Sequence, residues 1–316
     1  MNKLQAPKIL EVKQLKIQFK SKEKEDFTAV NDISFHIYEG ETYGLVGESG
    51  SGKSTTVRAI LNLVDITSGE IIYKDQTISD LNENKFRNIR KDMQMIFQEP
   101  ISSLDPKMKV GETLEEVLKI HGVFNKEQAM HQVIGILEKV GLSVEHFFKY
   151  PHQLSGGQAQ RACIARALII NPTVLVCDEP VSALDVSVQA QIINLLIDLK
   201  KSYNLTQIFI AHDLSVVRHI SDRIGTMYLG NIVEEAPTDI LFAEPLHPYT
   251  KLLLSSIPVP NPLEKRIYQE VIGEASIDNI GCKYKGKCPY VTEVCQTSKP
   301  ILKEVAEQHF VACHLY

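Results

Sequence analysis

A short glycine-rich segment constrains the fold of this sequence more than any other feature. Its residues are Gly47, Glu48, Ser49, Gly50, Ser51, Gly52, Lys53 and Ser54. A strand is predicted at 42–46 before it and a helix from Lys53 after it, which is the context of a phosphate-binding loop (P-loop). Glycines let successive backbone N–H groups point at phosphate oxygens, and the helix N-terminus adds partial positive charge there. Lys53 would supply a full charge to the β- and γ-phosphates, and the Ser54 hydroxyl would bind Mg²⁺. The segment therefore predicts a nucleotide site.

Two adjacent carboxylates follow a buried strand later in the chain. Residues 174–177 form a continuous apolar run, typical of a strand buried on both faces, and Asp178 and Glu179 come next. Asp178 can reach the hydration shell of a magnesium ion held near Ser54. Glu179 is placed to orient and deprotonate the attacking water. Alone, this pattern is also typical of solvated acids at a strand end, but after a P-loop it predicts ATP hydrolysis.

Two further polar residues follow predicted strands. Gln98 comes after a strand expected at 93–97 and would be an uncharged ligand of Mg²⁺ or water that senses the γ-phosphate. His212 follows a strand expected at 208–211 and would contact the γ-phosphate or support Glu179. Taken alone, Gln98 could be an exposed loop amide, and His212 a structural histidine or a helix cap. Their order along the chain is what singles them out.

Composition limits the remaining possibilities. The 316 residues, 44% of them hydrophobic, suffice for one large or two modest domains. The net charge of −5, with mixed signs, does not indicate a general nucleic-acid binder. No apolar run approaches the ~20 residues that span a bilayer. Residues 1–8 lack the apolar core of a secretory signal. We therefore expect a cytosolic location, with any membrane contact made through partners.

Predicted strands alternate with predicted helices over most of the chain. Strands are expected at 9–19 with a slip near Gln14, 33–38, 42–46, 93–97, 174–177, 207–211 and as a hairpin across 223–234. Helices are expected at 53–63, 112–140 with a turn near Gly122, 155–168 and 191–200. This alternation favours a parallel α/β sheet with an inserted helical lobe. The charged run at 21–26 is expected to be a hairpin tip. The composition changes after Pro258, where we place a domain boundary.

The order of these motifs resembles that of ATP-binding cassette (ABC) ATPases over roughly residues 8–258. Leu154-Ser155-Gly156-Gly157-Gln158 is similar to the family signature, and Ser182-Ala-Leu-Asp185 is similar to its D-loop. By itself the first phrase could be a helix N-cap turn at Ser155. Ala159 stands where the family usually has a polar residue, and no functional loss is expected from it. The resemblance implies an α/β P-loop NTPase fold with a RecA-like core, an antiparallel β subdomain and a helical subdomain.

The resemblance also implies how nucleotide is bound. Ser155, Gly156, Gly157 and Gln158 would bind the γ-phosphate held on a partner's P-loop, and Asp185 would lie in the dimer-spanning loop. An aromatic ring would stack on adenine just after the first strand, for which we predict Phe19, with Phe27 as the alternative. The implied cofactors are ATP and Mg²⁺, the metal being held by Ser54, Gln98 and Asp178. The full predicted nucleotide-binding set is Phe19, Gly47, Glu48, Ser49, Gly50, Ser51, Gly52, Lys53, Ser54, Thr55, Gln98, Ser155, Gly156, Gly157, Gln158, Asp178 and Asp185.

Three phrases resemble the ATPase subunits of oligopeptide and dipeptide importers. They are His247-Pro-Tyr-Thr-Lys251, Ser255-Ser-Ile-Pro-Val-Pro260 and Gln98-Glu-Pro-Ile-Ser-Ser-Leu-Asp-Pro106. The resemblance extends to a small cysteine-rich extension at 259–316, although the linker 273–280 lacks the prolines expected there.

The six cysteines fall into two groups. Two lie in apolar surroundings and are predicted to be inert core residues, namely Cys163 and Cys177. Four crowd into the extension, namely Cys282, Cys288, Cys295 and Cys313. In a reducing compartment such a group indicates a metal site before a set of disulfides. Four thiolates suit a [4Fe–4S] cluster, which the resemblance implies, and zinc or metal-free thiols are the alternatives.

The implied function is ATP binding and hydrolysis in an ABC importer of oligopeptides or dipeptides, at the cytoplasmic face of the cell membrane. The implied partners are a second ABC ATPase subunit, identical or related, two membrane permease subunits and an extracytoplasmic peptide-binding protein, with no nucleic acid. Import of a nickel complex or of glutathione is the alternative within transport. A soluble ABC ATPase acting on DNA or ribosomes usually has two cassettes or a long inserted arm. An iron–sulfur assembly ATPase would leave the His247 phrase unexplained.

Overall fold

The computed structural model describes residues 6–20, 26–257 and 280–316. The hairpin tip expected at 21–26 and the boundary and linker expected after Pro258 lie largely outside these residues. The chain divides into two units that are discontinuous in sequence. Among the described residues, the helical unit comprises residues 38–40 and 80–209 together with Ala6, and the P-loop unit comprises residues 7–20, 26–37, 41–79, 210–257 and 280–316. The division falls inside strand β8 (Thr206–Ala211).

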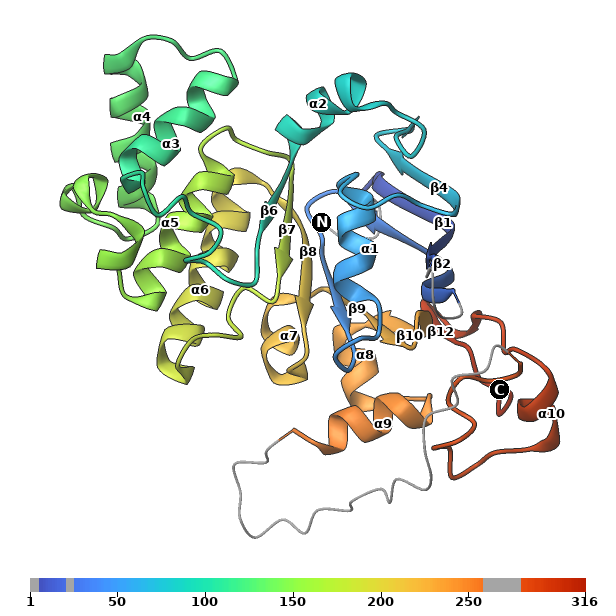
Figure 1. Cartoon of the computed structure of the whole chain (residues 1–316). Coiled ribbons are helices and arrows are strands. Elements are labelled where there is room, and N and C mark those ends of the chain that lie inside the picture. Colours follow the sequence, from blue (N-terminus) through green and yellow to red (C-terminus); the bar gives the residue numbers. More distant parts are fainter. Residues whose placement is uncertain (1–5, 21–25, 258–279) are drawn as a thin grey trace, which may run out of the picture. The chain divides into compact units, whose positions relative to one another are not determined.

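Two groups of strands form the P-loop unit (Figure 1). In the first, β1 (Lys8–Phe19) pairs antiparallel with β4 (Ser68–Tyr73), β4 pairs with β5 (Gln76–Thr77), and β2 (Phe27–Tyr38) flanks β1. In the second, β3 (Thr42–Val46) runs parallel to β9 (Arg223–Tyr228), and three antiparallel neighbours follow: β10 (Asn231–Pro237), β12 (His309–Val311) and β11 (Lys303–Ala306). Every residue of β3 is buried, as is typical of a strand covered on both faces.

The helices of the P-loop unit are short. They are α1 (Lys53–Ile60), α7 (Leu214–Ile220), α8 (Thr238–Ala243), α9 (Pro248–Ser255) and α10 (Glu293–Thr297). Helix α7 packs closely on β3, because a Cβ added to Gly44 would lie 2.6 Å from side-chain atoms of Val217 and Ser221. Glycine therefore lets this helix approach the central strand of the unit.

The irregularity expected near Gln14 is a β-bulge. The pairing of β1 with β4 shifts register between Lys13 and Lys16, and Gln14 has a φ of 48°. Gly69 lies opposite with a φ of +101°, and a Cβ there would be 2.5 Å from the Gln14 carbonyl oxygen. The break in alternation was therefore a true sequence signal of the bulge.

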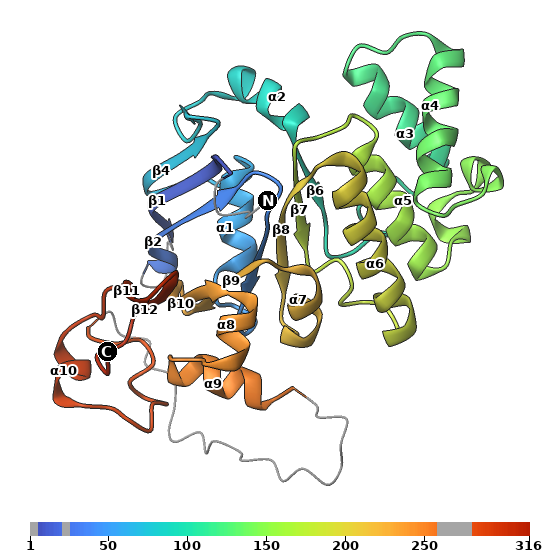
Figure 2. The same cartoon turned by 180° about the vertical axis from the view of Figure 1, so that it is seen from behind.

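The helical unit combines parallel strands with a group of helices. After α2 (Glu83–Asp92), strand β6 (Met93–Ile96) pairs parallel with β7 (Val174–Asp178). Helices α3 (Val110–Ile120) and α4 (Lys126–Lys139) contact each other and α5 (Gly156–Leu168), as Figure 2 shows. Short 3-10 turns, η2 (Val144–Phe148) and η3 (Pro151–Gln153), lead into α5, and α6 (Val186–Tyr203) leads into β8.

The predicted elements are largely confirmed. The parallel α/β organisation, the helical lobe with its turn after residue 120, and the hairpin of β9 and β10 are all present. Helix α1 ends at Ile60, before the predicted end, and α6 begins earlier than predicted, at Val186. The elements that were not predicted are strands β4, β5, β11 and β12 and helices α2, α7, α8, α9 and α10. Cys163 and Cys177 are fully buried, as expected. Within the residues described, no helix combines the length and apolar character needed to cross a membrane.

Candidate nucleotide site

The glycine-rich loop joins β3 to α1 in the P-loop unit (Figure 1). Lys53 is 4% exposed, and its Nζ donates to the carbonyl oxygens of Gly47 and Glu48 at 2.8 and 2.9 Å. It also donates to the Ser51 Oγ at 3.3 Å. The ammonium group is thus held inside the loop by the loop's own acceptors, where it can meet phosphate oxygens.

Glycine is required at two points of this loop. At Gly47 a Cβ would lie 2.1 Å from the Met227 carbonyl oxygen. Gly52 caps α1 with a φ of 103°, and a Cβ there would lie 2.4 Å from the Ala29 carbonyl oxygen. Both positions bring the loop against neighbouring backbone, so a side chain at either would displace it. The sequence pattern of the P-loop therefore has a steric basis in this chain.

The structure brings two predicted catalytic residues together in the helical unit. The Gln98 Nε2 donates to the Glu179 Oε2 at 3.0 Å. Glu179 follows the fully buried strand β7 with a φ of 46°, and its carbonyl oxygen accepts from the Ser182 backbone and hydroxyl at 3.3 and 3.1 Å. Asp178, the last residue of β7, is 1% exposed. The turn thus presents one carboxylate beside Gln98 and keeps the other at the end of the strand.

The signature segment opens helix α5. The Ser155 Oγ accepts from the Gln158 N–H at 3.3 Å, and the Gln158 Oε1 accepts from the Ser155 N–H at 3.0 Å. This is a reciprocal capping box, so the N-cap interpretation of Ser155 is confirmed. Ser155 and Gly156 are exposed at the helix N-terminus. Contact with a partner's nucleotide stays a prediction.

The predicted D-loop packs beside the signature. A Cβ at Gly156 would lie 3.3 Å from Leu184, and one at Gly157 would lie 2.7 Å from Val188. Asp185 is the exposed N-cap residue of α6 and makes no side-chain capping hydrogen bond. The two glycines thus let α5 approach the start of α6, which connects the two segments assigned to dimer contact.

His212 is exposed directly after β8. Asp213 caps helix α7, because its Oδ1 accepts from the Ser215 N–H at 2.8 Å. The alternative interpretation of His212 as a helix cap is therefore wrong.

The predicted site residues are divided between the two units. His212 and the P-loop belong to the P-loop unit, whereas the helical unit contains the signature, Gln98, Asp178 and Glu179. Their assembly around one nucleotide stays a prediction.

Both aromatic candidates for adenine stacking are exposed. Phe19 ends β1 with 45% of its surface exposed, and Phe27 begins β2 with 61% exposed. Neither is a core residue, which leaves both rings accessible to a ligand. The choice of Phe19 stays a prediction.

The cysteines of the C-terminal lobe (residues 280–316) share one neighbourhood. Burial, and then the nearby thiols of Cys295, Cys288 and Cys313, raise the pKa of Cys282 to about 11. The Cys282 N–H donates to the Cys295 carbonyl oxygen at 2.8 Å, and the Cys295 Sγ contacts the Thr292 Oγ1 at 3.3 Å. Among the described residues, no three His, Cys, Asp or Glu side chains are arranged to hold a metal ion. The spacing therefore predicted the gathering of thiols, but the described residues do not show the metal-ligand geometry expected from it.

Sequence reasoning missed the residue that supports the loop from behind. The Glu48 backbone N–H donates to the Tyr249 Oη at 2.8 Å, and Tyr249 is fully buried. Tyr249 belongs to the His247-Pro-Tyr-Thr phrase, which was recognised without a role. The two residues are 201 positions apart, so no local pattern could have joined them.

A buried polar group fixes the start of helix α9. The backbone N–H groups of Leu246 and His247 donate to the Glu234 carboxylate at 2.7 and 2.9 Å, and the His309 Nε2 meets the same carboxylate at 2.7 Å. The His247 Nδ1 accepts from the Tyr249 N–H at 3.1 Å. Burial lowers the pKa of His247 to about 4, so its imidazole is neutral at pH 7.

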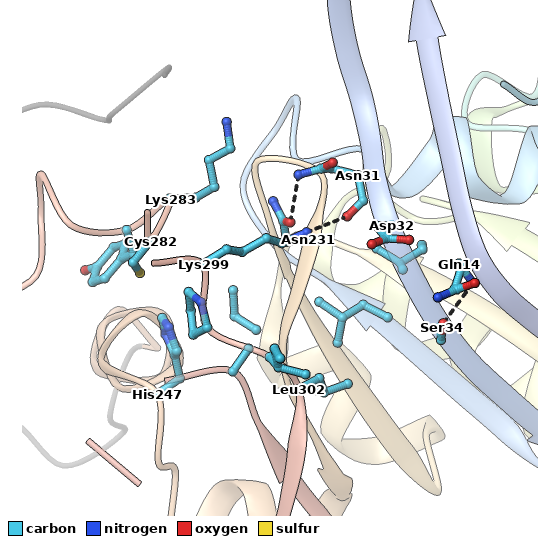
Figure 3. Close-up of a pocket in the computed structure, with 17 residues that line it drawn as sticks. Gln14, Asn31, Asp32, Ser34, Asn231, His247, Cys282, Lys283, Lys299 and Leu302 are labelled. Atoms are coloured by element: carbon cyan, nitrogen blue, oxygen red, sulfur yellow. Dashed lines mark hydrogen bonds between the residues drawn. The ribbon is translucent and has the colours of Figure 1, made fainter. Parts of the chain in front are cut away.

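A pocket of about 320 Å³ lies elsewhere in the P-loop unit (Figure 3). The Asn31 Nδ2 donates to the Asn231 Oδ1 at 3.2 Å at its rim, and the Lys299 Nζ donates to the Asn31 carbonyl oxygen at 3.3 Å. Cys282 and His247 also line it. No residue of the glycine-rich loop does, so this pocket is separate from the nucleotide site.

Comparison with known proteins agrees with this geometry. Residues 30–182 match the ABC transporter family, and residues 233–295 match the family described as oligopeptide/dipeptide transporter, C-terminal region. The oligopeptide transport ATP-binding protein AppF of Bacillus subtilis (strain 168) is 45% identical over 297 residues, which cover 92% of this chain and 90% of that protein. The glutathione import ATP-binding protein GsiA of Escherichia coli O157:H7 is 49% identical over 252 residues, 80% of this chain but 40% of that protein.

A solved structure confirms the predicted ABC ATPase fold. The ATP-binding cassette MJ0796, in a dimeric post-hydrolysis state bound to ADP and Pi, is 30% identical with a TM-score of 0.67. The alignment covers 73% of this chain and 99% of that one. The chain therefore belongs to the ABC transporter family, among the ATP-binding proteins that carry the oligopeptide/dipeptide transporter C-terminal region.

Proposed function

We propose that this chain is the ATP-binding and ATP-hydrolysing subunit of an ABC importer of oligopeptides or dipeptides. The observation that carries the proposal is the buried Lys53 inside the glycine-rich loop, in a chain that contains both matched families. The Gln98–Glu179 pair supplies the polar groups that hydrolysis needs. The relative AppF, named for oligopeptide transport, supports the choice of substrate class.

The proposed chemistry is hydrolysis of the β–γ phosphoanhydride bond of ATP. Lys53 neutralises phosphate charge, and the N–H groups of the loop orient the phosphates. Glu179 accepts a proton from the attacking water, whose oxygen forms the new bond to phosphorus while ADP leaves. The Gln98 amide N–H holds the Glu179 carboxylate in place for this step. His212 is proposed to contact the γ-phosphate or to support Glu179.

The residues proposed for magnesium have the donor chemistry of that ion. Ser54 offers a hydroxyl oxygen, Asp178 a carboxylate and Gln98 an amide oxygen, and Mg²⁺ prefers oxygen ligands. When bound, the ion would add positive charge against the β- and γ-phosphates. This assignment rests on donor chemistry and on the order of the motifs.

A dimer is proposed as the working form. Ser155 and Gly156 of the signature and the nearby Asp185 support it, because all three are exposed on the helical unit. In this proposal each chain offers Ser155, Gly156 and Gly157 to the nucleotide on its partner's P-loop. The similarity to a dimeric cassette is consistent with that arrangement. The partner ATPase is an identical or related chain.

The remaining partners follow from the proposed function. Two membrane permease subunits and an extracytoplasmic peptide-binding protein would complete the importer, with this chain at the cytoplasmic face of the membrane. The proposal keeps residues 8–258 as the ABC ATPase domain and residues 259–316 as the extension. The match of residues 233–295 to the C-terminal family supports an importer over a soluble ABC ATPase.

Glutathione import is the second candidate function. The similarity to GsiA favours it, although this chain spans only 40% of that protein. Uptake of labelled oligopeptides and of labelled glutathione should be measured in cells that carry either this chain or its Lys53→Ala variant. We expect the variant to lose MgATP binding and peptide uptake together. Lys53 is the only positively charged residue within residues 47–55, so its loss removes the charge that faces the phosphates. Retained MgATP affinity would refute the site assignment, and loss of glutathione uptake alone would favour the second candidate.

A [4Fe–4S] cluster in the C-terminal lobe is proposed separately from the ATPase function. The gathering of four thiols supports it, while their arrangement does not fit a single metal ion. Iron and acid-labile sulfide should be measured in anaerobically purified protein. Equal amounts of both, in a brown protein, are the expected result. A colourless protein with zinc or without metal would eliminate the cluster.

A further inference from the structure

A hydrogen bond between Glu48 and Tyr249 joins the nucleotide loop to the start of helix α9. Glu48 is the second residue of the loop, and its backbone N–H donates to the Tyr249 Oη at 2.8 Å. Both residues belong to the P-loop unit. A loop rich in glycine loses much backbone freedom when it becomes ordered, so an anchor on its first turn affects how readily it binds phosphate.

The Tyr249 ring is fixed from several sides. Its ring centroid lies 4.6 Å from that of Tyr228 and 5.6 Å from that of Tyr284. All three rings are at most 3% exposed. The His247 Nδ1 accepts from the Tyr249 backbone N–H, which fixes the first turn of α9. The hydroxyl therefore has little freedom to leave its position near the loop.

One of these rings belongs to the C-terminal lobe. Tyr284 lies two residues after Cys282, and both Cys282 and Cys288 pack against the tyrosine cluster. A second contact runs from the same lobe to the same loop residue, because the Lys287 Nζ lies 4.0 Å from the Glu48 Oε2. That ion pair is partly exposed and contributes little. The packing of Tyr284 on Tyr249 is the stronger connection.

We propose that Tyr249 is a positioning residue for the P-loop, and that the C-terminal lobe holds its ring in place. Tyr249 touches no nucleotide atom in this scheme; it fixes the backbone of Glu48, and the loop that follows is preorganised for phosphate. This inference rests on the proposed nucleotide site. It assigns the C-terminal lobe a role in nucleotide affinity that does not depend on any metal.

The chain offers a matched pair of variants for the test. Tyr249→Phe removes the hydroxyl that accepts from Glu48 and keeps the ring. Tyr228→Phe removes a hydroxyl from the same cluster, and the Tyr228 Oη is buried without a hydrogen-bond partner among the described residues. Calorimetric titration with the magnesium complex of AMP-PNP should show about three- to tenfold weaker binding for Tyr249→Phe, near the lower end of the cost of an unpaired N–H. Tyr228→Phe should bind within about twofold of the unmodified chain.

Kinetics separate positioning from general damage. For ATP hydrolysis, Tyr249→Phe should raise KM in step with the dissociation constant while kcat stays within about twofold, as loss of uniform binding predicts. Unchanged affinity in Tyr249→Phe would overturn the proposal, and so would an equal loss in both variants. Lys53→Ala serves as the reference for the nucleotide site itself. If it abolishes binding while Tyr249→Phe changes nothing, the proposed function stands and only the positioning role is lost.

Discussion

The Glu179→Gln variant tests the proposed catalytic base with little disturbance of the structure. The substitution replaces one carboxylate oxygen by an amide nitrogen and keeps the length of the side chain. The Gln98 Nε2, which now donates at 3.0 Å to the Glu179 Oε2, can still donate to the remaining carbonyl oxygen. The backbone at position 179 has a φ of 46°, and glutamine meets the same steric cost there as glutamate. The change therefore removes proton acceptance and little else.

The expected loss follows from the role of the carboxylate. General-base catalysis contributes about 10²- to 10⁴-fold to the rate, equivalent to about 3 to 5 kcal/mol of activation free energy. Affinity for MgATP should stay within about twofold, because Lys53 and the loop N–H groups are untouched. Binding without hydrolysis should also trap the closed dimer.

Phosphate release should be measured with the chain assembled with its partner subunits, alongside nucleotide binding and dimer content by size-exclusion chromatography. Glu138→Gln, which changes an exposed acid on α4 of the same unit, is the matched control and should keep full turnover. If Glu179→Gln retains more than about a tenth of the unmodified rate, another group accepts the proton and our assignment is wrong.

Two further predictions concern stability. Arg223 is buried between the carboxylates of Glu41 and Glu235, and its Nη1 lies 3.1 Å from the Glu41 Oε1. Arg223→Met leaves both buried carboxylates without their partner, so it should lower the free energy of unfolding, measured by urea titration, by about 3 to 5 kcal/mol. Lys8→Met breaks an exposed pair and should cost less than about 1 kcal/mol; similar losses would refute the role of burial. Burial lowers the pKa of His247 from 6.5 in the unfolded chain to about 4. The neutral imidazole therefore makes its full contribution to the free energy of unfolding above pH 6.5. That free energy should fall by roughly 3 kcal/mol as the pH drops from 6.5 toward 4, because the unfolded chain takes up the proton first. His247→Asn can still cap α9 and should make the free energy of unfolding less dependent on pH over that range. The same dependence on pH in the variant would contradict the assignment.

Several features of this chain could be predicted from the sequence because a short local pattern marks each of them. Glycines at 47 and 52 are required by close approach of backbone, and Ser155 forms the capping box that its spacing with Gln158 predicts. The bulge at Gln14 was predicted from a break in the alternation of apolar and polar residues. In each case the sequence signal is local, although the backbone that crowds Gly47 and Gly52 belongs to Met227 and Ala29, far away in sequence.

Contacts between distant segments could not be predicted in the same way. Glu48 and Tyr249 are 201 residues apart, and Glu234 and His309 are 75 apart. Neither pair follows a periodic pattern, and each depends on how β9, β10 and α9 are placed in three dimensions. The cysteines show the opposite failure, because their crowding in sequence predicted a metal geometry that the described residues do not form. Closeness in sequence is a good guide to which groups come together. It is a poorer guide to the angles and distances between them.

The pairing of β12 with β10 has a consequence for anyone who shortens this protein. Without the last strands, β10 would present a row of unpaired backbone N–H and C=O groups, a template for the strands of other molecules. In the whole chain that position passes to β11, whose four residues are all exposed and include Lys303 and Glu304. Charged side chains on an outermost strand discourage such aggregation. Removing the C-terminal lobe would thus expose the unpaired edge of β10. Poor solubility of a truncated cassette would then result from aggregation at that edge and not from a failure of the nucleotide site.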